Sequence, residues 1–395
     1  MTPHPLGRLL NILDYALSSL RRRLLKNLLV FAVFTLVVFL FASLLLTRGA
    51  LGDMAGRLLA AAPDITVQQL VAGRQVPIAA GACERLADIP GIGICRGRLW
   101  GYYFDGENGA NYTVIGLPEA PERWPAGLSG AVQGRLPQPG ERGKAVLSTA
   151  VRQQLGLEGR RFFSLFRPDL QLLSFEAVGT FTASSDALTA DTILLAEADI
   201  RHLFALPEDQ AIDLLIDVVN PLEIETIAAK IADRLPGVRV VSKGRIAKTY
   251  RAVFGWRSGI TATTLLLALA AFVILAWDRA SGLSGEELRE VGILKMLGWQ
   301  SGDIILLRFC ESLLVSLFAF LSGWLLAWVH VAYFQAPLLR PVFLGWSVLR
   351  PQFPLLPPVA AADLFLVLAI SVAPYLAATA VPAWRAATVP AHSVL

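Results

Sequence analysis

The chain has 395 residues, of which 55% are hydrophobic and 17% are charged, and its formal net charge is +4. This composition is too apolar for an ordinary soluble globular protein, so it predicts an integral membrane protein. The basic residues lie beside apolar runs rather than in a stripe interleaved with aromatic residues, which argues against nucleic-acid binding.

Leucines recur with near-helical spacing at the start of the chain, and they predict an amphipathic helix within residues 1–27 that lies on the membrane surface. The apolar run from Leu28 to Leu46 contains no charge and is long enough to cross the hydrocarbon core. It is also long for the core of a signal peptide, so we expect an uncleaved anchor. The basic residues before it predict a cytoplasmic N-terminus; they are Arg21, Arg22, Arg23 and Lys26.

Residues 47–259 carry an ordinary share of charge and many glycines and prolines, so we expect an α+β domain that folds in water outside the membrane. The last part of this insert predicts a β-α-β unit, with strands at Ile212–Val219 and Val238–Val241 and a helix at Glu223–Leu235 between them. Further predicted elements are strands at Phe175–Thr182 and Thr192–Leu195 and a helix at Glu197–Phe204.

The cysteines and histidines show no metal-ligand spacing, so we expect no metal site. The segment from Asp105 to Asn108 lacks the spaced ligands of a calcium loop and predicts a hairpin turn. Cys83 and Cys95 both lie in the insert, where a disulfide between them would contribute about 3 kcal/mol in an oxidising compartment. Two free buried thiols agree with the sequence equally well, because sequence does not give the separation of their Cα atoms.

Three further apolar runs, at residues 260–277, 304–334 and 361–383, are long enough to cross the membrane. Because successive spans cross the membrane in opposite directions, we expect the loop 278–303 and the tail 384–395 in the cytoplasm and the proline-rich loop 335–360 outside. The predicted fold class is therefore a membrane α-helical protein with four transmembrane helices and a large α+β extracytoplasmic domain between the first and second spans.

The segment from Glu286 to Leu297 predicts a short helix between the second and third spans. Acidic residues in its first turn and Lys295 near its end suit the helix dipole, and Gly298 is a natural stop. Composition alone fits a surface helix that lies under the membrane.

The string LREVGILKMLGWQSGDIILLRFCES, Leu288 to Ser312, resembles the cytoplasmic loop and third span of the MacB/FtsX-like family of ABC transporter permeases, which includes the LolC, LolE and MacB type. The family pattern is filled here by Arg289, Glu290, Gly292, Leu297, Gly298, Asp303, Ile304 and Glu311. The stretches ALSSLRRRLLKNLL, PAWRAATVPAHSVL and GRLPQPGERGKAVLSTAVRQQLGLEGRRFFSLF with FEAVGTF agree as well, so the resemblance covers nearly the whole chain. The last stretch looks like the family's extracytoplasmic domain, so the resemblance implies that residues 47–259 form a MacB-like periplasmic domain.

This resemblance implies a permease subunit of the bacterial inner membrane that works by mechanotransmission. The short helix would be the coupling helix that docks in an ATPase, through Glu287, Leu288, Arg289, Glu290, Gly292, Ile293, Lys295, Leu297 and Gly298. The implied partners are a dimer of cytoplasmic ABC ATPase subunits, a second permease copy or a paralogue, and a periplasmic adaptor or acceptor protein. Because the chain has no GxxxxGK[ST] loop, ATP and magnesium would be bound by the partner, and we expect no cofactor, no catalytic residue and no enzyme activity in this chain.

Arg308 and Glu311 lie within the third span, where charged side chains are costly and are usually paired or functional. Their spacing places them on one helix face. We expect a local salt bridge near the cytoplasmic end rather than a substrate site.

Three functions stay open at this stage. The first is a permease that exports or releases an envelope substrate, such as a lipoprotein, lipid, peptide or drug. The second is an FtsX-like regulator of a periplasmic cell-wall hydrolase, which the large insert disfavours. The third is a non-ABC membrane receptor, against which the coupling-helix match argues.

Overall fold

The computed structural model describes residues 5–121, 124, 128–182, 189–254, 259–281, 285–344, 349 and 353–388. The chain divides into two compact units. The helical unit comprises Met1–Gly52, Ala252–Phe343 and Leu355–Leu395, and the α+β unit comprises Asp53–Arg251 and Leu344–Pro354. Part of the predicted external loop and residues 389–395 of the predicted tail lie outside the described residues.

Four helices are long and apolar enough to cross a membrane: Leu24–Ala60, Gly259–Asp278, Ser301–Ala332 and Ala361–Arg385. They belong to α2 (Leu24–Ala61), α8 (Gly259–Ala280), α10 (Ser301–Ala332) and α12 (Ala361–Thr388). The predicted fold class, with four spans and an α+β domain between the first two, is confirmed.

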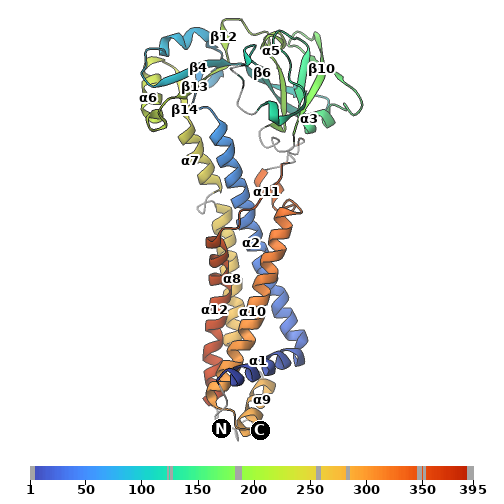
Figure 1. Ribbon diagram of the computed structural model, residues 1–395, viewed down its shortest axis with the longest axis vertical. Coiled ribbons are helices and arrows are strands. Elements are labelled where there is room, and N and C mark those ends of the chain that lie inside the picture. The colour runs from blue at the N-terminus through green and yellow to red at the C-terminus, as the bar shows by residue number, and fades with distance from the viewer. Residues whose placement is uncertain are drawn as a thin grey trace. The chain divides into compact units, whose positions relative to one another are not determined.

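The four long helices run beside one another in the helical unit, and α1 (Pro5–Arg22) crosses one end of them next to α9 (Gly285–Met296) (Figure 1). A short helix, α11 (Arg340–Leu344), interrupts the proline-rich loop between α10 and α12. Aromatic and aliphatic side chains such as Phe34, Phe272 and Phe320 form the apolar core of this bundle. At Gly323 of α10 an added Cβ atom would lie 2.7 Å from the Cβ of Val38, so the absence of a side chain allows α2 and α10 to approach closely.

The helix of the first span, α2, is longer than the sequence predicted. The apolar run ends at Leu46, but α2 continues to Ala61, and the first strand of the α+β unit begins only at Ile65. A second helix, α7 (Lys243–Phe254), occupies the other end of the predicted insert. The expected domain start at residue 47 is therefore wrong. The length of an apolar run shows how much of a helix lies in lipid, but the helix itself can continue beyond the membrane.

The α+β unit contains two large sheets, each with its own apolar core. The first sheet has the order β14-β1-β13-β4, with β2 added to β1. Its strands are β1 (Ile65–Val71), β2 (Arg74–Val76), β4 (Ile92–Arg98), β13 (Asp213–Val218) and β14 (Val238–Ser242). The helix α6 (Ile224–Arg234) joins β13 to β14 and buries Ile227 and Ile231 against this sheet.

The predicted β-α-β unit is confirmed, with one difference. Both β13 and β14 pair antiparallel with β1, so they are parallel to each other but are separated by that strand. The unit is therefore a split β-α-β, closed by a strand from much earlier in the chain.

The second sheet has the order β5-β6-β11-β8-β10-β7, with β9 also paired to β10. Its strands are β5 (Trp100–Asp105), β6 (Ala110–Leu117), β7 (Val132–Gly134), β8 (Lys144–Leu147), β9 (Phe162–Phe166), β10 (Leu172–Phe181) and β11 (Thr192–Ala196). Two short helices, α3 (Thr149–Gln154) and α5 (Glu197–Phe204), complete this part, and β3 (Ile78–Ala79) pairs with β12 (Gln210–Ala211). The predicted hairpin turn after Asp105 joins β5 to β6.

Asp213 of β13 joins the two sheets through an ion pair with the half-buried Arg98. Its carboxylate is fully buried and accepts hydrogen bonds from Arg98 Nε (2.9 Å) and Nη2 (2.6 Å) and from Trp100 Nε1 (3.0 Å). Because Trp100 begins β5 of the other sheet, this one carboxylate connects both sheets of the unit.

Cys83 and Cys95 form a disulfide, with their Cα atoms 5.7 Å apart. The bond ties β4 to the segment of short turns that precedes it.

Loss of this disulfide is expected to lower the free energy of unfolding of the α+β unit by about 3 kcal/mol, because the bond closes a short loop in the unfolded chain. The measurement is thermal unfolding of the full chain and of the Cys83→Ser/Cys95→Ser variant, each with and without reductant. Reductant should destabilise only the parent chain, since Cys310 is buried and unbonded. Equal thiol labelling of the denatured parent with and without reductant would contradict the bond.

Candidate functional site

One face of α9 packs against other helices of the helical unit. Its buried side chains are Glu287, Val291 and Leu294, and Gly292 is buried with them. Val291 packs with Ile304 of α10 and Ala387 of α12, and Leu294 packs in a second cluster with Ile12 of α1 and Leu307 of α10. The helix between the second and third spans is therefore held by three other helices.

The opposite face of α9 is exposed and largely apolar. Ile293 is 45% exposed, Met296 57% and Leu297 73%, and the charged side chains of Glu286 and Arg289 lie beside them. Exposed apolar residues gathered on one short helix mark a surface for another protein or for lipid. α9 thus has a docked face and a free face.

Gly298 ends α9 with its φ at +93°, in the left-handed region that favours glycine. The amide of Trp299 donates to Leu294 O (3.1 Å) and the amide of Gly298 donates to Lys295 O (3.0 Å). These two bonds form a Schellman motif, which satisfies the last carbonyls of the helix. The turn keeps Leu297 exposed at the end of α9.

Two glutamates on the docked side of α9 bind the basic residues at the junction of α1 and α2. Glu287 accepts from Arg23 Nη1 (2.7 Å) and lies 3.7 Å from Lys26 Nζ. Glu290 binds Arg22 and also Arg23 Nη2 (3.0 Å). The basic flank of the first span is therefore tied to a helix far away in the sequence.

Tyr15 of α1 adds a hydrogen bond from an uncharged donor to Glu290, with its hydroxyl donating over 3.0 Å. Burial, together with this bond and the charge of Glu290, raises the pKa of the Tyr15 phenol above its ordinary value. The hydroxyl therefore keeps its proton and remains a donor.

Arg308 and Glu311 of α10 complete what we call the charge cluster, which comprises Arg22, Arg23, Lys26, Glu287, Glu290, Arg308 and Glu311. The guanidinium Nη1 of Arg308 lies 2.7 Å from Glu311 Oε2, and its Nη2 lies 3.8 Å from Glu290 Oε2. Both residues are only 3% exposed. The expected local salt bridge is present in the structure, and Arg308 extends it to α9.

The first turn of α1 is tied to α10 as well. Arg8 Nε donates to Asp303 Oδ1 over 2.7 Å. Asp303 also forms a capping box with Gln300 at the start of α10. Since Arg22 binds α9 at the other end, both ends of α1 are fixed to the segment that follows the second span.

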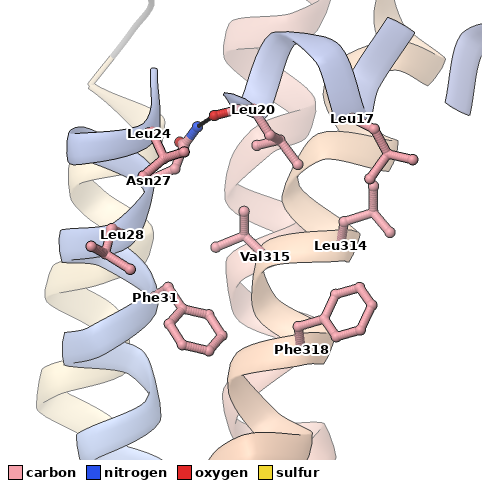
Figure 2. A pocket seen from close by; sticks show the side chains of 9 residues that line it. All are labelled: Leu17, Leu20, Leu24, Asn27, Leu28, Phe31, Leu314, Val315 and Phe318. Atoms are coloured by element: carbon pink, nitrogen blue, oxygen red, sulfur yellow. Dashed lines mark hydrogen bonds between the residues drawn. The ribbon is translucent and has the colours of Figure 1, made fainter. Parts of the chain in front are cut away.

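An apolar groove of about 230 Å³ lies next to the charge cluster, between α1, α2 and α10. Figure 2 shows its nine lining residues, which are Leu17, Leu20, Leu24, Asn27, Leu28, Phe31, Leu314, Val315 and Phe318. Asn27 is the polar member, and its amide donates to Leu20 O over 3.1 Å (Figure 2). The groove shares Leu20, Asn27 and Val315 with a small polar cavity lined by four members of the charge cluster. A thin layer of side chains therefore separates the cluster from the apolar groove.

The structure divides the residues that the sequence assigned to the coupling helix. Glu287, Glu290 and Gly292 lie on the docked side, and Leu288 and Lys295 are half-buried. Arg289, Ile293, Leu297 and Gly298 are exposed. Sequence analysis missed Met296, which shares the exposed face, and the contacts of Glu287 and Glu290 with α1. Among the described residues, no group of three His, Cys, Asp or Glu side chains is placed to hold a metal.

Comparisons with known proteins identify the part of the chain that contains α9. Residues 260–391 match the family model described as FtsX-like permease C-terminal. Among solved structures, the extracellular domain of the noncanonical ABC-type transporter YknZ from Gram-positive bacteria is similar to 45% of this chain over 99% of its own length, with 10% identity and a TM-score of 0.32. No match was found among curated proteins.

Proposed function

We propose that this chain, whose residues 260–391 match the FtsX-like permease C-terminal family model, is a membrane subunit of an ABC transporter and converts ATP hydrolysis by a separate cytoplasmic ATPase into movement of its α+β domain. The observation that carries this proposal is the two-sided α9, whose free face has Ile293, Met296 and Leu297 and whose docked face binds α1 and α10. The free face would receive the ATPase. The docked face would pass its movement to the spans.

The charge cluster supports this relay. A helix that is held by ion pairs to two neighbouring helices cannot shift unless those helices move with it or the ion pairs break. Packed helices of this kind switch between discrete arrangements and do not deform continuously. When the ATPase subunits close, α9 would carry α1 and α10 with it. The substrate would then be handled at the α+β domain and need not cross the membrane through this chain.

The arrangement in the cell follows from the same proposal. The basic residues before the first span support a cytoplasmic position for α1 and α9, with the α+β domain outside the inner membrane. ATP and magnesium would be bound by a dimer of ATPase subunits, with a second copy or a paralogue of this chain completing the complex. The cargo would be an envelope substrate such as a lipoprotein, lipid, peptide or drug.

The experiment is to purify the tagged full chain from its native host and to reconstitute it in nanodiscs with the P-loop ATPase that accompanies it. We expect a stable complex whose ATP hydrolysis differs from that of the ATPase alone. A chain that carries no P-loop subunit through purification, and that leaves the activity of every encoded candidate ATPase unchanged, would favour a membrane receptor instead.

A further inference from the structure

A polar pocket of about 610 Å³ lies on the seven-stranded sheet of the α+β unit. Three arginines line it, Arg135, Arg152 and Arg161, together with Glu176 and the backbone of β10 from residue 177 to residue 180. The volume is within the range of about 300–1,000 Å³ that is usual for small-molecule sites.

The pocket forms where β10 changes its neighbour. On the side away from β8, the first half of β10 pairs with β9 as far as Glu176, and the second half pairs with β7 from Gly179 onward. Between these two pairings the register with β8 shifts at residues 177–179, which is a β-bulge. Bulges of this kind interrupt a ladder and redirect the side chains around it.

Two of the arginines are fixed at the sides of this interruption by backbone hydrogen bonds. The amide of Ala177 donates to Arg161 O (2.7 Å), and the amide of Arg135 donates to Val178 O (3.2 Å). Arg152 reaches the same place from α3 and donates to Thr180 Oγ1 (3.3 Å). Three arginines from three separate segments therefore lie around one bulge: Arg135 directly after β7, Arg152 in α3 and Arg161 directly before β9.

The acidic groups near the pocket are already paired. Glu141 binds Arg135 through two hydrogen bonds of 2.7 and 2.8 Å, and these bonds hold the pKa of Glu141 at about 2. Glu176 pairs with Lys144, which lowers the pKa of Glu176, with smaller contributions from Arg161 and Arg135. Among the described residues, neither Arg152 nor Arg161 has a carboxylate within ion-pair distance. Within the described part of the chain, these two guanidinium groups therefore form no direct ion pair at the pocket.

We propose that this pocket binds the phosphate group of an anionic ligand, with Arg152 and Arg161 as its main contacts. A guanidinium group presents parallel N–H donors that match two phosphate oxygens, and bonds between ionised partners are about twice as strong as neutral ones. The space beyond the phosphate would take the rest of a phosphate ester, either a soluble one or the headgroup of a phospholipid. This site lies within the α+β unit and does not depend on the proposed coupling to an ATPase.

The test is calorimetric titration of the detergent-solubilised full chain with inorganic phosphate and with glycerol 3-phosphate, at constant ionic strength set by chloride. We expect saturable binding that Arg152→Gln and Arg161→Gln each weaken about tenfold, the loss of one charged hydrogen bond. Arg160→Gln is the matched control, because Arg160 is an exposed neighbour in the sequence that does not line the pocket. Its affinity should remain within about twofold of the parent.

Two further arms separate the sources of the phosphate. Tighter binding of glycerol 3-phosphate than of inorganic phosphate supports a soluble ester. Binding to vesicles of phosphatidylglycerol but not of phosphatidylcholine, with the same loss in Arg152→Gln and Arg161→Gln, supports a lipid headgroup. The proposal is overturned if no probe binds saturably, or if Arg160→Gln weakens binding as much as Arg161→Gln does. Because the Arg161 side chain is exposed, its variant should keep the unfolding temperature of the parent, so a misfolded sample cannot explain the result.

Discussion

Replacing Arg308 with alanine is expected to destabilise the helical unit by about 3–5 kcal/mol, the usual cost of removing one partner of a buried ion pair. Arg308 and Glu311 are each 3% exposed, and the guanidinium also faces Glu290. Without it, the Glu311 carboxylate would stay buried without its cation. The measurement is resistance of the detergent-solubilised chain to thermal or dodecyl sulfate denaturation.

The double variant Arg308→Ala/Glu311→Ala is the matched control, because it removes both charges together. It should regain a large part of the lost stability, since buried ion pairs replaced as a whole cost far less than broken ones. If the single and double variants are equally unstable, the loss comes from packing alone. If Arg308→Ala is as stable as the parent, the charge cluster does not hold the helices together.

Replacing Leu297 with glutamate is expected to weaken binding of the ATPase about 100-fold while leaving the chain folded. Leu297 directly follows α9 and is 73% exposed, more than Ile293 or Met296 on the same face. A loss of this size corresponds to about 2.7 kcal/mol, which is typical of a central apolar contact in an interface. Exposed substitutions away from packed features usually change stability little. The measurement is the dissociation constant of the ATPase from the chain in nanodiscs.

Val219→Glu controls for the added charge, since Val219 is 75% exposed and belongs to the α+β unit. Equal weakening by both variants would point to a general charge effect and would contradict a docking face on α9.

Replacing Glu290 with glutamine tests the other face of α9. We expect it to bind the ATPase with nearly the parent affinity but to lose ATPase stimulation, because Glu290 connects α9 to Arg22 and Arg23.

Much of the architecture is predictable because its signals are local. A span is recognised by the length of its apolar run, and α9 is recognised by acidic residues in its first turn and Gly298 at its end. The prediction fails at the end of α2, because Thr47 to Ala61 contains no proline and its three glycines lie inside the helix instead of ending it. Hydropathy reports the solvent around a helix, and it cannot report where the helix ends.

The candidate site was predictable in position but not in orientation. Sequence reasoning placed Glu287 and Glu290 among the residues that meet the ATPase, whereas the structure turns them toward Arg22 and Arg23. The spacing of residues within one helix cannot reveal partners in another. The same limit applies to Asp213, which looks like an ordinary strand residue until Arg98 and Trp100 are placed beside it.

The pairing of Arg22 with Glu290, 268 residues apart, also sets an order of events during synthesis. The arginines of α1 leave the ribosome long before α9 and α10, so they are free to act as topology signals while the first span inserts. They are neutralised only when the last third of the chain arrives. In the proposed orientation, one set of positive charges would serve twice, because it would first orient the nascent chain and later bind α9. A chain truncated before α9 would then insert in the same direction and still leave α1 without these partners.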